Sequence, residues 1–502
     1  MKKYLDDLSS DDWKTLSEAY AHDAQSFFSQ EKAFDYDAQQ RTVDLLKNME
    51  IPEKGVPFEQ VRTLITQDVL PGSIHQHARG YLAFPDKGSF ASAQYASILA
   101  DAINQNVIAD DKSAPTGTYL ETALIHWMRK LVGYIAETTP YPASALELGG
   151  AFVTGGVLAN SIGLLGARQA RFPETKTKGM ASLQKSPKII VPGQTMSHYS
   201  HFGSSWWLGF GTDNVIETPC DGNGRIDQEQ LEKTLLQLEQ EDTPVVAVIA
   251  VMGDSRTNTL EDLPGLYAIT QRHNVWLHAD ACHGGILMFD YSFTHEGQHI
   301  LSYSDSLSFD PHKHLGVTYS NSVILFKDAS HLANVGSSTD ITIAYNSNDI
   351  GQITPFLGSR TLDALKFYAV LLELGTDGIL SFINARKKLA KDWAKKINAS
   401  TNFVTMHDPE LFAVSFSIKP SKNEPANELS AKNLLLHDTL YREGELILHK
   451  FKIRDYRNRL GYGADANVMA FGSFIGFDSY TDSDLDALIQ KLESTYQKLF
   501  AD

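Results

Sequence analysis

Two apolar runs of the chain end in residues that could do chemistry. Asp280 closes "VWLHAD", and Lys313 follows further along in "FDPHKHLG". Burying a carboxylate is costly unless the charge is paired, and a protonated ring nitrogen would be a suitable partner. A buried lysine has a lowered pKa, which makes it a nucleophile able to form a Schiff base. A helix-capping aspartate and a surface lysine are the alternatives for each residue alone, but together the two predict a ligand.

A glycine turn offers a place for an anion. In "FVTGGVLANSIGLLGARQA" an expected strand runs through Gly155, Gly156 and Val157 into an expected helix. Backbone N–H groups at such a turn, together with the helix dipole, bind phosphate, and glycine lets the phosphate approach closely. A tight turn without a ligand is the alternative.

Two histidines follow the apolar run "KIIVPG". His198 and His201 lie in "QTMSHYSHFG", and an imidazole can lie flat on a heteroaromatic ring, although a capping or solvent-exposed histidine is the alternative. A phosphate, an aromatic ring, a pyridinium nitrogen and an aldehyde occur together in pyridoxal 5'-phosphate, which proteins bind with a lysine and an acidic partner. The four sets of residues therefore predict this cofactor.

The composition is that of a folded, acidic protein. The 502 residues are 42% hydrophobic and 21% charged, as in ordinary globular chains. The formal charge of −17 argues against nucleic acid as a partner. Cys220 and Cys282 lack metal-ligand spacing, so we expect neither a disulfide nor a metal site. No signal-peptide pattern and no run of about eighteen apolar residues stands out, so we expect a cytoplasmic protein with no membrane partner.

The strands and helices that must position these residues are expected to form an α/β fold. Apolar runs alternate with helical patterns between residues 150 and 330, which predicts a mostly parallel sheet covered by helices on both faces. Such sheets bind ligands beyond the carboxyl ends of their strands. We predict an N-terminal helical arm and dimerisation segment over 1–95, a large cofactor-binding domain over 96–378 and a small C-terminal α/β domain over 379–502. The seven runs are "GAFVTG", "KIIVPG", "NVIETP", "VVAVIAVMG", "VWLHAD", "SLSFD" and "SVILF".

The motifs resemble those of the group II pyridoxal-phosphate-dependent amino-acid decarboxylases. "TGGVLAN", "HYS", the strand ending in Asp280 and "DPHK" occur in the family's order, within a resemblance that spans residues 77 to 375. The resemblance implies the aspartate-aminotransferase-like fold type I of pyridoxal phosphate enzymes, and a homodimer. It also implies that Lys313 forms the Schiff base, that Asp280 pairs with the pyridinium nitrogen and that His198 stacks on the ring.

The same resemblance places further residues. Residues 155–157 and Ser255 would contact the phosphate, and His312 would lie near the phosphate and the substrate. Cys282 stands where the family has a small apolar residue against the opposite ring face. Tyr345, in "AYNSND", is the candidate for the mobile-loop tyrosine that protonates the carbanion left after carbon dioxide departs.

The substrate pocket departs from the family pattern. Phe84 and Pro85 resemble pocket residues of the family, but Ala83 stands where aromatic-substrate members carry a bulkier tyrosine. His314 replaces a tryptophan of those members. His283 and His314 would either contact the substrate or pack behind the pocket. The identity of the amino acid stays open.

The predicted activity is α-decarboxylation of an L-amino acid to the amine and carbon dioxide, a carboxy-lyase reaction. An oxidative decarboxylase that forms an aldehyde is one alternative, and in related proteins it goes with loss of the loop tyrosine, so Tyr345 argues against it. A catalytically silent regulator or scaffold is another. The joint presence of Lys313, Asp280 and His198 argues against that alternative.

Overall fold

The seven apolar runs form one central sheet in the computed structural model, which describes residues 4–50, 53–196, 198–337 and 347–500. The strand order is β1-β9-β8-β5-β4-β2-β3. Adjacent strands are parallel except that β9 is antiparallel to both β1 and β8. The mostly parallel sheet is therefore confirmed. Its strands are β1 Gly150–Val153, β2 Lys188–Pro192, β3 Val215–Thr218, β4 Val245–Val251, β5 Trp276–Asp280, β8 Ser306–Phe309 and β9 Ser322–Phe326.

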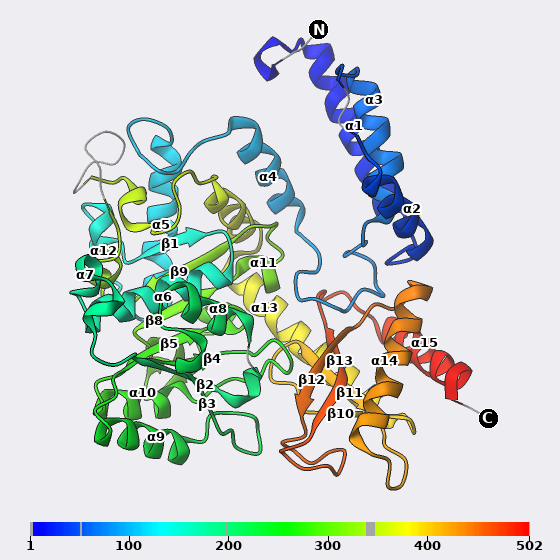
Figure 1. Cartoon of the computed structure of the whole chain (residues 1–502). Helices are drawn as coiled ribbons and strands as arrows, with labels where there is room; N and C mark the ends of the chain where they lie inside the picture. Colours follow the sequence, from blue (N-terminus) through cyan, green and yellow to red (C-terminus); the bar gives the residue numbers. More distant parts are fainter. Residues whose placement is uncertain (1–3, 51–52, 197, 338–346, 501–502) are drawn as a thin grey trace.

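Helices cover the central sheet and bury its strands (Figure 1). All residues of β4 are buried, as expected for a parallel strand with helices over both faces. Helix α6 packs on β4, β8 and β9, while α10 packs on β4 and β5. The helices of this part are α4 Ala91–Ile103, α5 Pro115–Leu131, α6 Gly156–Arg171, α7 Thr175–Lys178, α8 Tyr199–Trp207, α9 Gln228–Gln240, α10 Leu263–Arg272, α11 Pro311–His314 and α12 Ala329–Ala333.

A second, antiparallel sheet forms the C-terminal part of the chain. Its strand order is β10-β11-β13-β12, with a hydrophobic core that includes Trp393, Phe416 and Phe471. The helix α13 (Asp363–Ala399) joins the two parts and bends at Gly375, whose φ of 60° suits glycine. The predicted boundary at residue 378 lies close to this bend and stays a prediction. The other elements are β10 Phe403–Thr405, β11 Ala413–Ile418, α14 Ala426–Glu443, β12 His449–Arg454, β13 Asn467–Phe474 and α15 Asp482–Phe500.

The helix α13 is relevant to whether the chain could cross a membrane. Among the described residues it is the one helix whose length and composition would allow it to cross a membrane, a test that a core helix passes as well. Several of its side chains, including Phe367, Ile383 and Trp393, are buried in the protein. The expectation of no membrane partner therefore stays a prediction.

The N-terminal residues form a helical arm. Helices α1 (Ser10–Phe28), α2 (Tyr36–Lys47) and α3 (Phe58–Leu64) project away from the large domain (Figure 1). Phe34 and Ile447 share the small cluster that holds the arm to the C-terminal part. The arm exposes a series of large apolar side chains, which are Trp13, Tyr20, Phe28, Leu45, Leu46, Met49, Phe58, Val61, Leu64, Ile65 and Val69.

A buried ion pair holds the edge strand β1, which leads into the glycine turn. Glu121 on α5 is 1% exposed, and its Oε2 lies 2.9 Å from Nη2 of Arg360. Glu121 Oε1 accepts from the backbone N of Phe152, and Arg360 Nη1 donates to the carbonyl of Phe152. The ion pair therefore holds β1 in place by bonding both the backbone N–H and the backbone C=O of Phe152.

We expect Arg360→Leu to lower the free energy of unfolding by about 3–5 kcal/mol, because it leaves the Glu121 carboxylate buried without its cation. Urea unfolding followed by tryptophan fluorescence measures the loss. The double variant with Glu121→Leu should recover most of it. Lys388→Leu, which removes an exposed pair with Asp392, should change stability by less than about 0.5 kcal/mol. An Arg360→Leu loss as small as that control would contradict the role of the buried pair.

Candidate active site

A cavity of about 740 Å³ opens at the carboxyl edge of the central sheet. The loops that follow β1, β4, β5 and β8 all reach it, because parallel strands bring their carboxyl ends to one edge. Tyr345 lies outside the described residues, so its predicted position stays a prediction. All other predicted site residues line the cavity, namely Gly155, Gly156, Val157, His198, Ser255, Asp280, Cys282, His312 and Lys313.

Lys313 projects into the cavity from α11, a single helical turn after β8. Its Nζ lies 3.0 Å from Oδ2 of Asp310, three residues earlier. Burial works against the charged amine, but the charges of Asp310 and Asp280 outweigh it and raise the pKa of Lys313 above its usual range. Burial by itself lowers this pKa as expected, but the expected net lowering is wrong for the cofactor-free chain. The reason is that a carboxylate in contact stabilises the ammonium form more than burial destabilises it.

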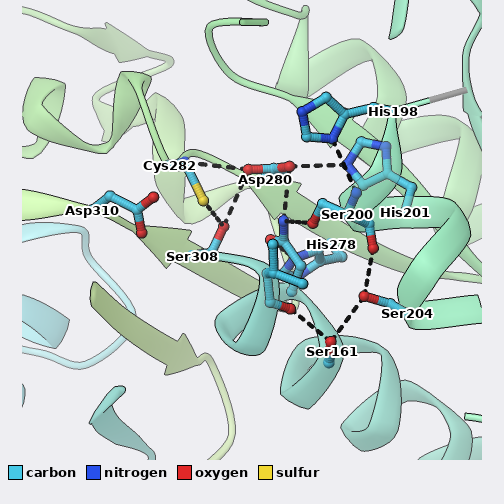
Figure 2. A network of polar contacts seen from close by, with 12 residues as sticks. Ser161, His198, Ser200, His201, Ser204, His278, Asp280, Cys282, Ser308 and Asp310 are labelled. Atoms are coloured by element: carbon cyan, nitrogen blue, oxygen red, sulfur yellow. Dashed lines mark hydrogen bonds and ion pairs between the residues drawn. The ribbon is translucent and has the colours of Figure 1, made fainter. Parts of the chain in front are cut away.

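Asp280, the last residue of β5, is the centre of a polar network (Figure 2). Its Oδ2 lies 2.9 Å from Nε2 of His201 and accepts from Nδ2 of Asn160 at 2.9 Å. Burial alone would raise the pKa of Asp280, but the hydrogen bond from His201 and the charge of Lys313 hold it well below the usual range. The carboxylate is therefore ionised.

A chain of hydrogen bonds ends on the carboxylate of Asp280. The indole N–H of Trp276 donates to Oγ of Ser306, whose hydroxyl lies 2.8 Å from Nδ1 of His278. His278 Nε2 lies 3.0 Å from Oδ1 of Asn160, and the amide of Asn160 donates to Asp280. Because Oδ1 of Asn160 can only accept, Nε2 of His278 carries a hydrogen and donates to it. Burial lowers the pKa of His278 to about 4, so His278 is neutral and its Nδ1 accepts from Ser306.

We expect the neutral His278 to make the protein less stable in acid. Burial lowers the pKa of His278 from 6.5 to about 4. Between these values the unfolded chain binds a proton that the folded chain does not, so the free energy of unfolding falls as the pH drops. His278 alone should lower the free energy of unfolding by about 2 kcal/mol between about pH 7 and pH 5. Urea unfolding at both pH values should show a smaller fall for His278→Gln than for the wild-type protein. Equal falls in the two proteins would contradict this assignment.

The glycine turn leaves the start of α6 open toward the cavity. Gly155 is the residue before the helix, and no side chain of the described residues caps it. At Gly156 a Cβ would stand 2.5 Å from Cys282 Sγ and 2.6 Å from Asp310 Oδ2, so only glycine fits. Ser255 lines the same cavity from the loop after β4. An uncapped helix start with glycine and a hydroxyl beside it suits a phosphate group.

Two of the remaining predicted side chains, His198 and Cys282, keep neutral forms. His198 accepts from the backbone N of Ser200 at the start of α8, and burial lowers its pKa to about 3. Cys282 lies 3.4 Å from the hydroxyl of Ser308, and burial raises the pKa of its thiol well above the usual range. His312 donates from Nδ1 to the carbonyl of Asn321 at 2.6 Å. A neutral imidazole and a neutral thiol can pack against an aromatic ring without adding charge.

His283 and His314 differ in their position relative to the cavity. His283 lines the cavity, whereas His314 lies behind it. Arg386 donates to Nδ1 of His314 at 3.2 Å, and His314 Nε2 lies 3.0 Å from Nδ1 of His283. Asn258 also donates toward that Nδ1. Since arginine can only donate, each histidine accepts at Nδ1 and carries its hydrogen on Nε2. His283 therefore offers a fixed N–H group at the cavity wall.

Reasoning from the sequence missed several polar residues of the cavity, among them Asp86, Asn160, Asp310 and Tyr319. Asp310 had a usable signal, since three residues within one helical turn bring Asp310 and Lys313 to the same side. Asn160 lies one turn after Gly156 on α6, but its contact with Asp280 depends on how α6 packs on the sheet. Asp86 and Tyr319 lie in loops, where spacing along the chain says little about contacts.

The fold and the site together define a class of enzyme. A mostly parallel sheet that brings an amine, an ionised carboxylate and an open helix start to one cavity has the donor set that pyridoxal 5'-phosphate requires. This is the pyridoxal-phosphate fold type I. The family model "Pyridoxal-dependent decarboxylase conserved domain" matches residues 40–419, which is more than half of the chain. The chain belongs to this family.

Relatives with known names agree with the family. The chain is 27% identical over 392 residues to an L-2,4-diaminobutyrate decarboxylase of Acinetobacter baumannii, covering 74% of this chain and 72% of that protein. It is 26% identical over 434 residues to the acidic amino acid decarboxylase GADL1 of Homo sapiens, covering 82% of this chain and 79% of that protein. The apo crystal structure of mouse CSAD matches with a TM-score of 0.82 at 22% identity over 96% of this chain and 99% of that chain. The activity is pyridoxal-phosphate-dependent amino-acid decarboxylation, and neither alternative is favoured.

Proposed function

We propose that the cavity decarboxylates an L-amino acid at Cα, with three walls that each hold one part of the cofactor. Lys313 would hold the aldehyde carbon, Asp280 the ring nitrogen, and residues 155–157 with Ser255 the phosphate. The observation that carries the proposal is that the Lys313 amine, the ionised Asp280 and the uncapped start of α6 border one cavity.

The side chains would act mainly through charge and proton placement. When bound, pyridoxal 5'-phosphate supplies an electron-poor ring that accepts the electron pair left as carbon dioxide departs. The carboxylate of Asp280 would keep a proton on the ring nitrogen, because a negative charge in a dry site favours the cationic ring. Asp310 Oδ2, at 3.0 Å, is the acceptor in reach of a proton from the Lys313 amine.

Four further side chains complete the proposed site. His198 would stack on one ring face and Cys282 on the other, both in neutral form. His312 would lie near the phosphate and the substrate. Tyr345 would return the proton to Cα.

Mass spectrometry tests the proposal. The purified protein, supplied with pyridoxal 5'-phosphate and a mixture of protein amino acids, ornithine, diaminobutyrate, cysteine sulfinate and DOPA, should form one amine with loss of carbon dioxide. An aldehyde with ammonia would move the protein to the oxidative class. Bound cofactor without any product would favour the catalytically silent alternative.

We also propose a homodimer in the cytoplasm. The exposed apolar side chains of the arm, such as Trp13, Phe28 and Leu64, support burial against a second copy. Free Cys220 and Cys282 suit a reducing compartment. Light scattering should give twice the 55.6 kDa mass of the chain, and a monomer at micromolar concentration would contradict the dimer.

A further inference from the structure

The carboxylate of Asp86 lies in the cavity wall without a cation. Asp86 follows "YLAFP" and lines the cavity beside Tyr319, His312 and Lys313. The hydroxyl of Tyr319 hydrogen-bonds to it. Its Oδ1 is buried and has no hydrogen-bond partner, and no lysine, arginine or histidine within the described ranges lies at ion-pair distance. The side chain therefore has acceptor capacity that the protein does not use.

The other carboxylates of the cavity have partners that account for their charge. Asp280 contacts His201, and Asp310 contacts Lys313 at 3.0 Å. Asp254 accepts from the backbone N atoms of Arg256 and Thr257 at the turn after β4. Among the described residues that line the cavity, Asp86 is the carboxylate with neither an ion-pair partner nor a backbone N–H donor.

An uncompensated carboxylate at this position is costly unless a ligand supplies the missing charge. Burial raises the pKa of Asp86, and the hydrogen bond from Tyr319 together with the nearby charge of Lys313 offsets this only in part. A cation that enters the cavity would restore the charged form and recover the lost solvation.

The surroundings of Asp86 favour an aliphatic chain that ends in this cation. The rings of Phe84 and His449 contact each other at a tilt, with centroids 5.0 Å apart, and burial lowers the pKa of His449. The rings of His312 and Tyr319 lie 4.7 Å apart on the same wall. Arg256 also lines the cavity, next to Ser255 in the loop proposed to bind the phosphate. Its Nε donates to a backbone carbonyl.

We propose that the substrate is an L-amino acid whose side chain ends in a primary amine, and that Asp86 binds this ammonium group. The inference rests on the proposed decarboxylase function and narrows its substrate class. An acidic side chain would be repelled by Asp86, and a neutral one would leave the carboxylate unpaired. Diaminobutyrate, ornithine and lysine carry the required chemistry with chains of different length.

Steady-state kinetics of the holoenzyme tests this substrate class. Diaminobutyrate is compared with norvaline, and ornithine with norleucine, because a methyl group replaces the ammonium in each pair; glutamate represents the acidic class. We expect kcat/KM for the better diamino acid to exceed that of its neutral isostere by about 100-fold or more. Asp86→Asn should reduce this ratio at least about 10-fold, and the exposed control Asp465→Asn should leave it unchanged.

Binding of a product diamine gives a readout that needs no turnover. Isothermal titration of the holoenzyme with 1,3-diaminopropane and with butylamine compares an ammonium with a methyl group in the same place. We expect at least about 10-fold tighter binding of the diamine to the wild-type protein. Asp86→Asn should remove this preference, whereas Asp465→Asn should keep it.

The outcomes separate this inference from the proposed function. Amine release from neutral or acidic amino acids at rates equal to the diamino acids, or equal binding of the two amines, would overturn the role of Asp86 and leave the decarboxylase standing. A holoenzyme that forms no amine from any amino acid would overturn the proposed function, and equal binding of diamine and monoamine would then overturn the Asp86 inference as well.

Discussion

Lys313→Ala is expected to abolish decarboxylation and the visible absorption of the bound cofactor together. The Lys313 amine is the lysine nitrogen that borders the cavity, and an alanine offers no nucleophile for an aldehyde. We expect kcat to fall by at least about 10³-fold, a loss typical of removing the group that forms a covalent bond. The spectrum of the purified protein with added pyridoxal 5'-phosphate and an amine-release assay measure the two effects.

The control for this variant is Lys388→Ala on α13. Lys388 is exposed and pairs only with Asp392 among the described residues, so its removal should leave both the spectrum and the rate unchanged. Added methylamine should partly restore the rate of Lys313→Ala, because it supplies the missing amine. A Lys313→Ala protein that keeps its visible band would assign the cofactor to another lysine.

Asp280→Asn should slow turnover but leave the cofactor attached to Lys313. Asparagine cannot carry the negative charge that would hold a proton on the ring nitrogen, and its amide would face the donors of Asn160 and His201. We expect kcat to fall by about 10²- to 10³-fold, as for the loss of one preorganised electrostatic partner. The visible band should persist because Lys313 is intact.

Asp280→Glu is the matched comparison, since it keeps the charge but moves the carboxylate by one methylene. It should retain more activity than Asp280→Asn. If asparagine and aspartate supported equal rates, the charge at this position would not take part in the reaction.

Local patterns identified most of the candidate site because its chemistry follows from strand ends. Each apolar run of the central sheet contributes a strand, and several predicted residues lie at the end of such a strand or in the loop after it. Asp280 closes β5, Lys313 follows β8, and residues 155–157 follow β1. Parallel strands place those ends on one edge, so residue types and their order were enough to bring them to one cavity.

The charge states were decided by distances that no spacing rule reports. Lys313 is a cation rather than a free amine because Asp310 lies 3.0 Å away. Asp280 is ionised because His201 on α8 and Asn160 on α6 converge on its Oδ2. These contacts depend on the tilt and depth of helices packed on the sheet, which are set by the whole core.

The sequence by itself therefore determined the type of fold, the cofactor and most of the residues expected around it, since continuous apolar runs and the residue types at strand ends are local properties. The tertiary structure alone decided the antiparallel insertion of β9, the partner of each buried charge and the position of Asp86 without a cation. The physical reason is that the energy of a buried charge depends on neighbours within a few ångströms, and those neighbours come from segments far apart in the chain.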